Sequence, residues 1–326
     1  MEGFFSVFTV ELLQSSIRLA TPILLAALGG ALCNQAGVLN LALEAKMLLG
    51  AFVGIVAAFY LGNSYAGFVV AMLAGGSLGL FFAFLYHKYK VDLVILAIAF
   101  NLIIAELTVF VMRAMFGNVG SWSDPSIVRL PDIELPIIQE IPVIGPILSG
   151  YNIIVYISWL ATIVMFIVLY KMRSGRHLRA TGEAKSAAET VGIRAVLLQT
   201  LALVIAGMLC GLAGAFLSIG HLKLFTRNMS AGRGWVAVAA AMFGMNHPFG
   251  VFFASMFFGF ADAFSVRVQA VTDLPPNLVK LLPYLATLVV LTIIALRTKL
   301  ALSMARRRFR ASLRAEEAAK AAEGPA

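Results

Sequence analysis

The sequence predicts an all-α membrane protein whose helices cross the bilayer many times. Of its 326 residues, 61% are hydrophobic and only 13% are charged, whereas a soluble domain has about 25% charged residues. The mean hydropathy is +0.93. Apolar runs recur along most of the chain, and a spanning helix needs about 20 mainly apolar residues. We therefore expect a polytopic transmembrane helical bundle.

The apolar runs give nine candidate spans, with eight to ten as the range. They lie at residues 12–33, 38–61, 64–86, 91–116, 151–171, 195–219, 234–246, 248–268 and 278–297. The run at 234–246 is short for a full crossing, so we expect a half-helix or re-entrant element that other protein segments cover. Residues 1–300 thus form a transmembrane domain, and 301–326 form a tail that is first basic and then rich in Ala and Glu.

The basic residues indicate the orientation of the chain. Lys and Arg gather in cytoplasmic loops of membrane proteins, and here most of them lie at 87–90, in the loop 172–194 and in the C-terminal tail. With nine spans these three segments share one side, so we expect the C-terminus in the cytoplasm and the N-terminus and loop 117–150 outside. The net charge of +9 then reports topology and contact with anionic lipid, and we expect no nucleic-acid binding.

Polar residues inside the spans are candidates for a translocation pathway, because such residues are costly in a bilayer and usually face a cavity or a partner. Asn40 and Glu44 are four residues apart and share a helix face, while Lys46 points away from Glu44. Asn101 lies mid-bilayer, ~15 Å from the cytoplasmic end of its helix. Amides with one or two carboxylates suit a neutral, hydroxyl-rich solute, although hydrogen bonds between helices are the alternative for each residue. The pathway candidates are Asn34, Asn40, Glu44, Asn101 and Glu106.

Small residues recur at spacings that allow helices to approach closely in lipid. These are Gly75, Gly79, Gly207, Gly211 and Gly214. We expect them to lie where helices pack backbone against backbone.

The chain lacks the residue patterns of an enzyme or a metal site. It has no phosphate-binding loop and no His-Glu-x-x-His pair, and its four histidines lie at span ends. Cys33 and Cys210 have no spacing for zinc or a redox pair, so we expect them to be packing residues. The sequence therefore predicts no catalytic residues, no metal and no cofactor bound by this chain.

The segment 181–192 is polar and rich in small residues, between two apolar runs. Ser186 and Glu189 form a capping box, which predicts a short helix that starts at Ser186, and Gly192 favours the left-handed conformation that ends a helix. A helix of about one and a half turns is not stable alone. We interpret it as a peg that docks into another protein, with an ordinary cytoplasmic loop as the alternative.

Three separated motifs carry a resemblance to a known family. They are GVLNLALEAKMLLGAF at 37–52, GEAKSAAETVGI at 182–193 and GRGWVAVAAAMFGMNHPFG at 232–250. In this order and spacing, they resemble the permeases of bacterial ABC importers, and most of all the simple-sugar and nucleoside branch, which is related to the ribose and branched-chain amino-acid permeases. This chain departs from the family at 44–47, where the family usually has Glu-Gly-Met, and at 33–36, where a charged pair is common.

The resemblance implies a type II ABC importer permease in the bacterial inner membrane. Such a permease pairs with a second permease chain, here expected as a heterodimer, and with a cytoplasmic ATPase that uses ATP and Mg²⁺. An extracytoplasmic binding protein delivers the solute, here a nucleoside or simple sugar. The resemblance also implies that 182–193 is the coupling helix that contacts the ATPase. Its expected contact residues are Gly182, Glu183, Ser186, Ala187, Ala188, Glu189 and Gly192.

Other functions remain open at this point. Within the same class, the solute could be a branched-chain amino acid or another small molecule. A stand-alone secondary transporter or channel would need its own energy-coupling or filter residues, and the sequence shows none.

Overall fold

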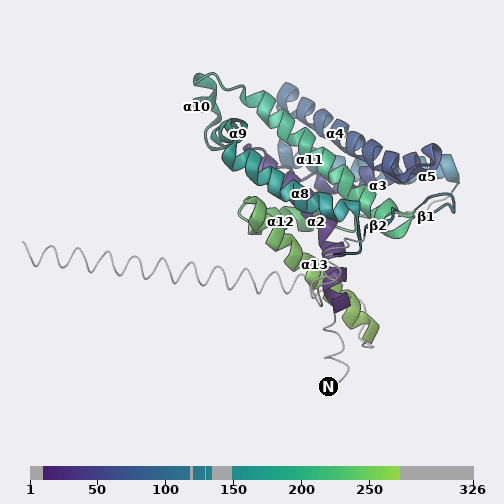
Figure 1. Ribbon diagram of the computed structural model, residues 1–326. Coiled ribbons are helices and arrows are strands. Elements are labelled where there is room, and N and C mark those ends of the chain that lie inside the picture. The colour runs from purple at the N-terminus through teal and green to yellow at the C-terminus, as the bar shows by residue number, and fades with distance from the viewer. Residues whose placement is uncertain (1–9, 118–119, 129, 134–148, 272–326) are drawn as a thin grey trace, which may run out of the picture. The chain divides into compact units, whose positions relative to one another are not determined.

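The computed structural model describes residues 10–117, 120–128, 130–133 and 149–271 (Figure 1). Seven helices in this part of the chain are long and apolar enough to cross a membrane. They are α2 (Val10–Gln35), α3 (Leu43–Leu61), α4 (Ser64–Tyr89), α5 (Leu93–Phe116), α8 (Ile153–Phe166) with its π-helical continuation η1 (Ile167–Lys171), α11 (Ala195–Ala215) with its π-helical continuation η2 (Phe216–Leu222), and α13 (Pro248–Val271). The predicted all-α, polytopic fold is confirmed. The ninth candidate span, 278–297, and the tail 301–326 lie outside the described residues.

Short elements connect the long helices. They are the strands β1 (Ser121–Trp122), β2 (Asp132–Ile133), β3 (Tyr151–Asn152) and β4 (Phe225–Thr226), and the helices α9 (Arg173–Glu183), α10 (Lys185–Thr190) and α12 (Arg233–Phe243). The strands pair antiparallel, β1 with β4 and β2 with β3. The described part of loop 117–150 packs on its own bundle, since the Trp122 ring stacks on Phe116 with centroids 4.0 Å apart and Ile127 is buried.

The centre of the bundle is α11, which packs against α4, α3 and α2 (Figure 1). Glycines permit this packing, as predicted. A Cβ atom at Gly75 would clash with the carbonyl oxygen of Gly207, and one at Gly214 would clash with that of Met47. Because two backbones meet directly at such positions, van der Waals contact holds the helices together without a hydrophobic driving force.

The helix that follows α2 starts later than predicted. The candidate span 38–61 is helical only from Leu43. Gly37 has a left-handed φ of 75°, and the side-chain oxygen of Asn40 accepts a hydrogen bond from the Ala42 N–H at 3.2 Å. Non-helical backbone at membrane depth is tolerated only where protein covers it, and Val38, Asn40 and Ala42 are all buried.

Within the predicted loop 172–194, the chain forms a helix that the sequence analysis missed. In α9, the buried residues Gly175, Leu178 and Thr181 recur every three residues, and arginines such as Arg176 lie on the exposed side. Near the C-terminus of α9, a Cβ atom at Gly182 would clash with the carbonyl oxygen of Gln35. The end of α9 therefore rests directly on the end of α2.

Two neighbouring glycines of α4 provide a matched stability test. Gly75→Ala places a methyl group against the backbone of Gly207, whereas Gly76→Ala meets side-chain atoms alone, those of Met208 and Val204. We expect Gly75→Ala to lower the free energy of unfolding by about 1–3 kcal/mol through overpacking. Gly76→Ala should be neutral or slightly stabilising, because Ala favours a helix over Gly by up to about 1 kcal/mol.

Thermal unfolding of the two purified variants in the same detergent would test this expectation. Equal midpoints for Gly75→Ala and Gly76→Ala would contradict a close backbone contact between α4 and α11.

Candidate functional site

The carboxylate of Glu44 holds the N-terminus of the half-helix α12. It accepts hydrogen bonds from the N–H of Gly232 at 2.9 Å, the hydroxyl of Ser230 at 2.5 Å and the N–H of Gly234 at 2.6 Å. The first N–H groups of a helix have no partner within the helix, and a negative charge there interacts favourably with the helix dipole. Glu44 is buried and supplies both a hydrogen-bond acceptor and a negative charge.

α12 has 11 residues, about half the length needed to cross a bilayer. The half-helix predicted at 234–246 is thus confirmed in length.

Asn101 of α5 has the same role for the N-terminus of α3. Its side-chain oxygen accepts from the N–H of Ala45 at 2.9 Å, and its NH₂ group donates to the carbonyl of Leu41 at 3.2 Å. Two helix N-termini, those of α3 and α12, therefore meet beside Glu44, and each is held by a side chain from another segment.

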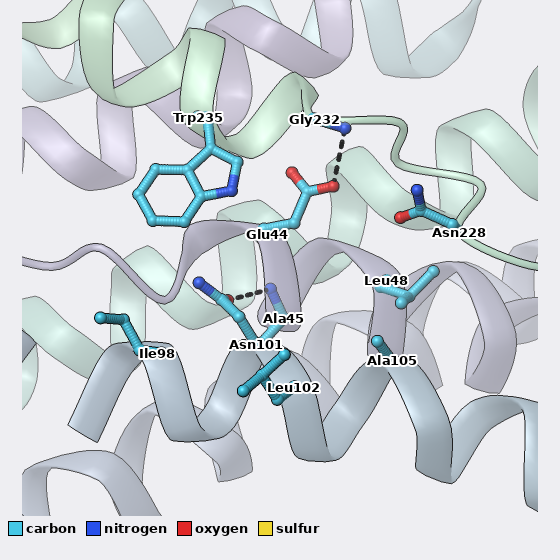
Figure 2. A pocket seen from close by; sticks show the side chains of 10 residues that line it. All are labelled: Glu44, Ala45, Leu48, Ile98, Asn101, Leu102, Ala105, Asn228, Gly232 and Trp235. Carbon is cyan, nitrogen blue, oxygen red and sulfur yellow. Dashed lines mark hydrogen bonds between the residues drawn. The ribbon is translucent and has the colours of Figure 1, made fainter. Parts of the chain in front are cut away.

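A cavity of about 290 Å³ lies between these helix starts and α5 (Figure 2). Its volume is close to the lower end of the range for small-molecule sites, about 300 Å³. Its lining combines a carboxylate, two amides and an indole with aliphatic side chains. The lining residues are Glu44, Ala45, Leu48, Ile98, Asn101, Leu102, Ala105, Asn228, Gly232 and Trp235.

On the other side of α3, Lys46 is fully buried. Its amino group donates to the side-chain oxygen of Asn40 at 3.0 Å and lies 4.7 Å from the centroid of the Phe82 ring. It forms no ion pair with a carboxylate of the described residues, which agrees with the prediction that it points away from Glu44. Asn40 also donates to the sulfur of Cys33 at 3.6 Å, so Lys46 and Asn40 together fix the non-helical stretch before α3.

Three of the five pathway candidates lie away from this cavity. Asn34 donates to the side-chain oxygen of Asn246 at 2.9 Å, Asn40 is buried beside Lys46, and Glu106 forms an exposed ion pair with Arg227 at 3.2 Å. Of the five pathway candidates, only Glu44 and Asn101 line the cavity.

Sequence reasoning did not single out Trp235 or Asn228, which both line the cavity. The signal for Trp235 was an aromatic residue between glycine and an apolar run, and that pattern also fits an ordinary lipid-facing residue. Asn228 lies in a loop segment, where an amide is common.

The short helix α10 exists, but its predicted start was wrong. It begins at Lys185, and Ser186 forms no capping hydrogen bond. The reason is that α9 ends directly before it: the carbonyl of Ala184 already accepts from the Ala188 N–H at 3.0 Å, so the helix has started when the chain reaches Ser186. The predicted end is confirmed, since Gly192 has a φ of 83° and its N–H bonds the carbonyl of Glu189 at 3.0 Å.

The residues of the predicted coupling segment differ in exposure. Ala188 is buried against its own chain, and Gly182 rests on the end of α2. Glu183, Ser186, Ala187, Glu189 and Gly192 are exposed. A partner could therefore contact only the exposed group.

The described residues contain no group of three or more His, Cys, Asp or Glu side chains that could hold a metal ion. Cys33 and Cys210 are free thiols and are buried, as expected for packing residues.

The Lys46 and Asn40 side chains give a test by a double-mutant cycle. Asn40→Leu leaves the amino group of Lys46 buried without its hydrogen bond, which costs about 2 kcal/mol or more. In the Lys46→Met background that group is gone, so we expect the same Asn40→Leu change to cost at least about 1 kcal/mol less. Thermal unfolding of the four purified proteins measures both costs, and equal costs in the two backgrounds would contradict the interaction.

Comparison with known proteins identifies the relatives of this chain. Residues 12–291 match the model of the family described as branched-chain amino acid transport system, permease component. A protein of Haloferax volcanii named as a glucose ABC transporter permease is 32% identical over 315 residues, which cover 90% of this chain and 94% of the relative. A guanosine ABC transporter permease of Bacillus subtilis is 29% identical over 86% of this chain and 91% of its own length.

A nucleoside ABC transporter permease of Lactococcus lactis is 25% identical over 88% of this chain and 93% of the relative. Each of these three organisms has a second permease that also matches. No solved structure matches. The family match spans most of the chain and all the described helices that form the site, so the protein is a multi-pass membrane protein that belongs to the family of branched-chain amino acid transport system permease components.

Proposed function

We propose that this protein is the permease subunit of an ATP-driven importer that moves a nucleoside or a simple sugar across the bacterial inner membrane. The observation that carries the proposal is that relatives matching over nearly their whole length are named as permeases for glucose, guanosine and nucleosides. The resemblance of the three sequence motifs leads to the same branch of the family.

The chemistry of the cavity supports a neutral solute. No Lys or Arg is among the described residues that line the cavity. The carboxylate in this lining, that of Glu44, is already bonded to the start of α12. A branched-chain amino acid, which the family description names, carries a carboxylate and an ammonium group. Both charges of that zwitterion would need partners in the site, and the described lining offers no cation for the carboxylate and no unbonded carboxylate for the ammonium group.

Partner chains complete the proposed importer. The paired permeases of the three organisms support a second permease subunit and a heterodimer. The proposal further includes a cytoplasmic ATPase that binds ATP and Mg²⁺, and an external solute-binding protein. In this assembly the N-terminus and loop 117–150 lie outside, and α9, α10 and the C-terminus lie in the cytoplasm.

Uptake by the reconstituted complex tests the proposal. The chain would be co-purified with its ATPase and second permease and placed in liposomes with the binding protein. We expect ATP-dependent uptake of radiolabelled guanosine or glucose, and none of leucine. Uptake by this chain alone without ATP would instead support a stand-alone transporter and contradict the proposal.

Docking of α10 on the ATPase gives a second test. Ala187 is exposed on α10, so Ala187→Glu should bury an unpaired charge in the interface and prevent docking. We expect the variant to insert normally, to lose co-purification with the ATPase and to lose ATP-driven uptake. Ser186→Ala should have little effect, because Ser186 makes no capping bond.

Ser123→Glu is the matched control, because it changes a small exposed residue to Glu in the loop proposed to lie outside. Normal ATPase co-purification of Ala187→Glu would contradict the assignment of α10 as the coupling helix. Ala188 is unsuitable for this test, since it is buried within its own chain.

A further inference from the structure

The polar groups around the cavity differ in whether they are already bonded within the protein. Both carboxylate oxygens of Glu44 accept from the start of α12, and both ends of the Asn101 amide are bonded to the start of α3 and the segment before it. These two residues therefore hold the walls of the cavity. Their substitution would disturb the helix starts whether or not a solute touches them.

Trp235 and Asn228 are different. Among the described residues, neither side chain has a hydrogen-bond partner, and both line the cavity (Figure 2). Trp235 is 45% exposed, and Asn228 is also exposed. A carboxamide without a hydrogen-bond partner is costly away from water. Asn228 and Asn101 line the same cavity, and we infer that polar solutes or water enter it.

The positions of both residues are fixed by the backbone. Trp235 directly follows Gly234, whose N–H is bonded to Glu44 at 2.6 Å, and its own N–H bonds the carbonyl of Gly232 at 3.0 Å. Asn228 has a left-handed φ of 55°, and its carbonyl accepts from the Ala231 N–H at 2.9 Å. A site with fixed walls loses little entropy when it binds a solute.

The chemistry of this pair defines the class of ligand. An indole offers a flat apolar face for stacking, and a carboxamide offers one acceptor and two donors. The nearest cation in sequence, Arg227, is paired with Glu106 at 3.2 Å, so no free cation in the described lining can receive a phosphate. The pair thus fits an uncharged ring that carries hydroxyl or amide groups, such as a nucleoside or a pyranose, and it does not fit a nucleotide or a sugar phosphate.

We propose that Trp235 and Asn228 form the solute-contact site of the cavity, where Trp235 stacks on the ring of the solute and Asn228 hydrogen-bonds its polar edge. This inference rests on the proposed import function and names the residues that select the solute. In this assignment Glu44 and Asn101 position the cavity walls. Trp235 and Asn228, whose side chains have no hydrogen-bond partner among the described residues, select for ring solutes.

The test uses the complete importer in liposomes, with radiolabelled guanosine and glucose as probes, because either ring could be the natural one. With saturating loaded binding protein, we expect Trp235→Leu to lower the uptake rate of the transported probe about tenfold or more, in line with the strength of aromatic stacking. Trp235→Phe keeps an aromatic face and should stay within about threefold of wild type. Asn228→Gly removes the carboxamide without backbone strain, because Gly accepts a left-handed φ, and should also lower the uptake rate.

Phe110→Leu is the matched control, since Phe110 is an aromatic residue on α5 with 69% exposure that does not line the cavity. It should transport like wild type, and all variants should retain the ATPase on purification. Wild-type uptake rates for both Trp235→Leu and Asn228→Gly would overturn the inference and leave the proposed function intact. If the wild-type importer takes up neither probe, the proposed substrate class fails, and the inference fails with it.

Discussion

The fold depends on one constraint: a helix that starts inside a membrane must find partners for its first N–H groups within the protein. In α3 and α12, side chains from other segments supply such partners. Glu44 bonds the N–H groups of Gly232 and Gly234, and Asn101 bonds that of Ala45. Because Glu44 is itself at the start of α3, the two starts are tied to each other. The cavity exists where the two broken segments leave space between them.

The glycines of the bundle make this arrangement sterically possible. α11 approaches α4 and α3 so closely that Gly75, Gly207 and Gly214 leave no room for a Cβ atom. This packing holds the first half of α3 against α11 and leaves its other side for α5 and α12. Gly234, at the start of α12, must also be glycine, since a Cβ atom there would clash with the backbone of Glu44. Glycine thus serves both the helix packing and the capping of α12.

Hydropathy predicted the membrane class, the helix positions and the short α12, because these follow from the length of apolar runs. It could not predict where α3 begins, since residues 38–42 are as apolar as the helix that follows. It also missed α9, whose polar composition hides a narrow buried stripe of Gly175, Leu178 and Thr181. The capping box at Ser186 was wrong because a cap depends on the preceding backbone, and α9 already supplies the start of α10.

The pathway residues show a sharper limit of sequence reasoning. A polar side chain inside a span predicts a hydrogen-bond partner, but the partner of Glu44 and Asn101 is the backbone of a broken helix, and a sequence does not show where a helix breaks. Conversely, Trp235 carries no polar signal in an apolar run. Its importance appears only when the cavity is seen beside it. The residues most easily found from sequence therefore hold the site, and the residues left to contact a solute are found from structure.

The same contacts give a physical route between the cavity and the segment proposed to meet the ATPase. Gly182 at the end of α9 rests on the carbonyl of Gln35, and the Gln35 side chain donates to the carbonyl of Asn246 at 3.2 Å, just beyond α12. α12 then runs ~16 Å at 1.5 Å per residue from that end to the N–H groups held by Glu44. Through α12, a displacement at Asn246 would act on the turn that carries Trp235. A half-helix in this position therefore joins the segment proposed to meet the ATPase, through Gln35, to the helix start that forms one wall of the cavity.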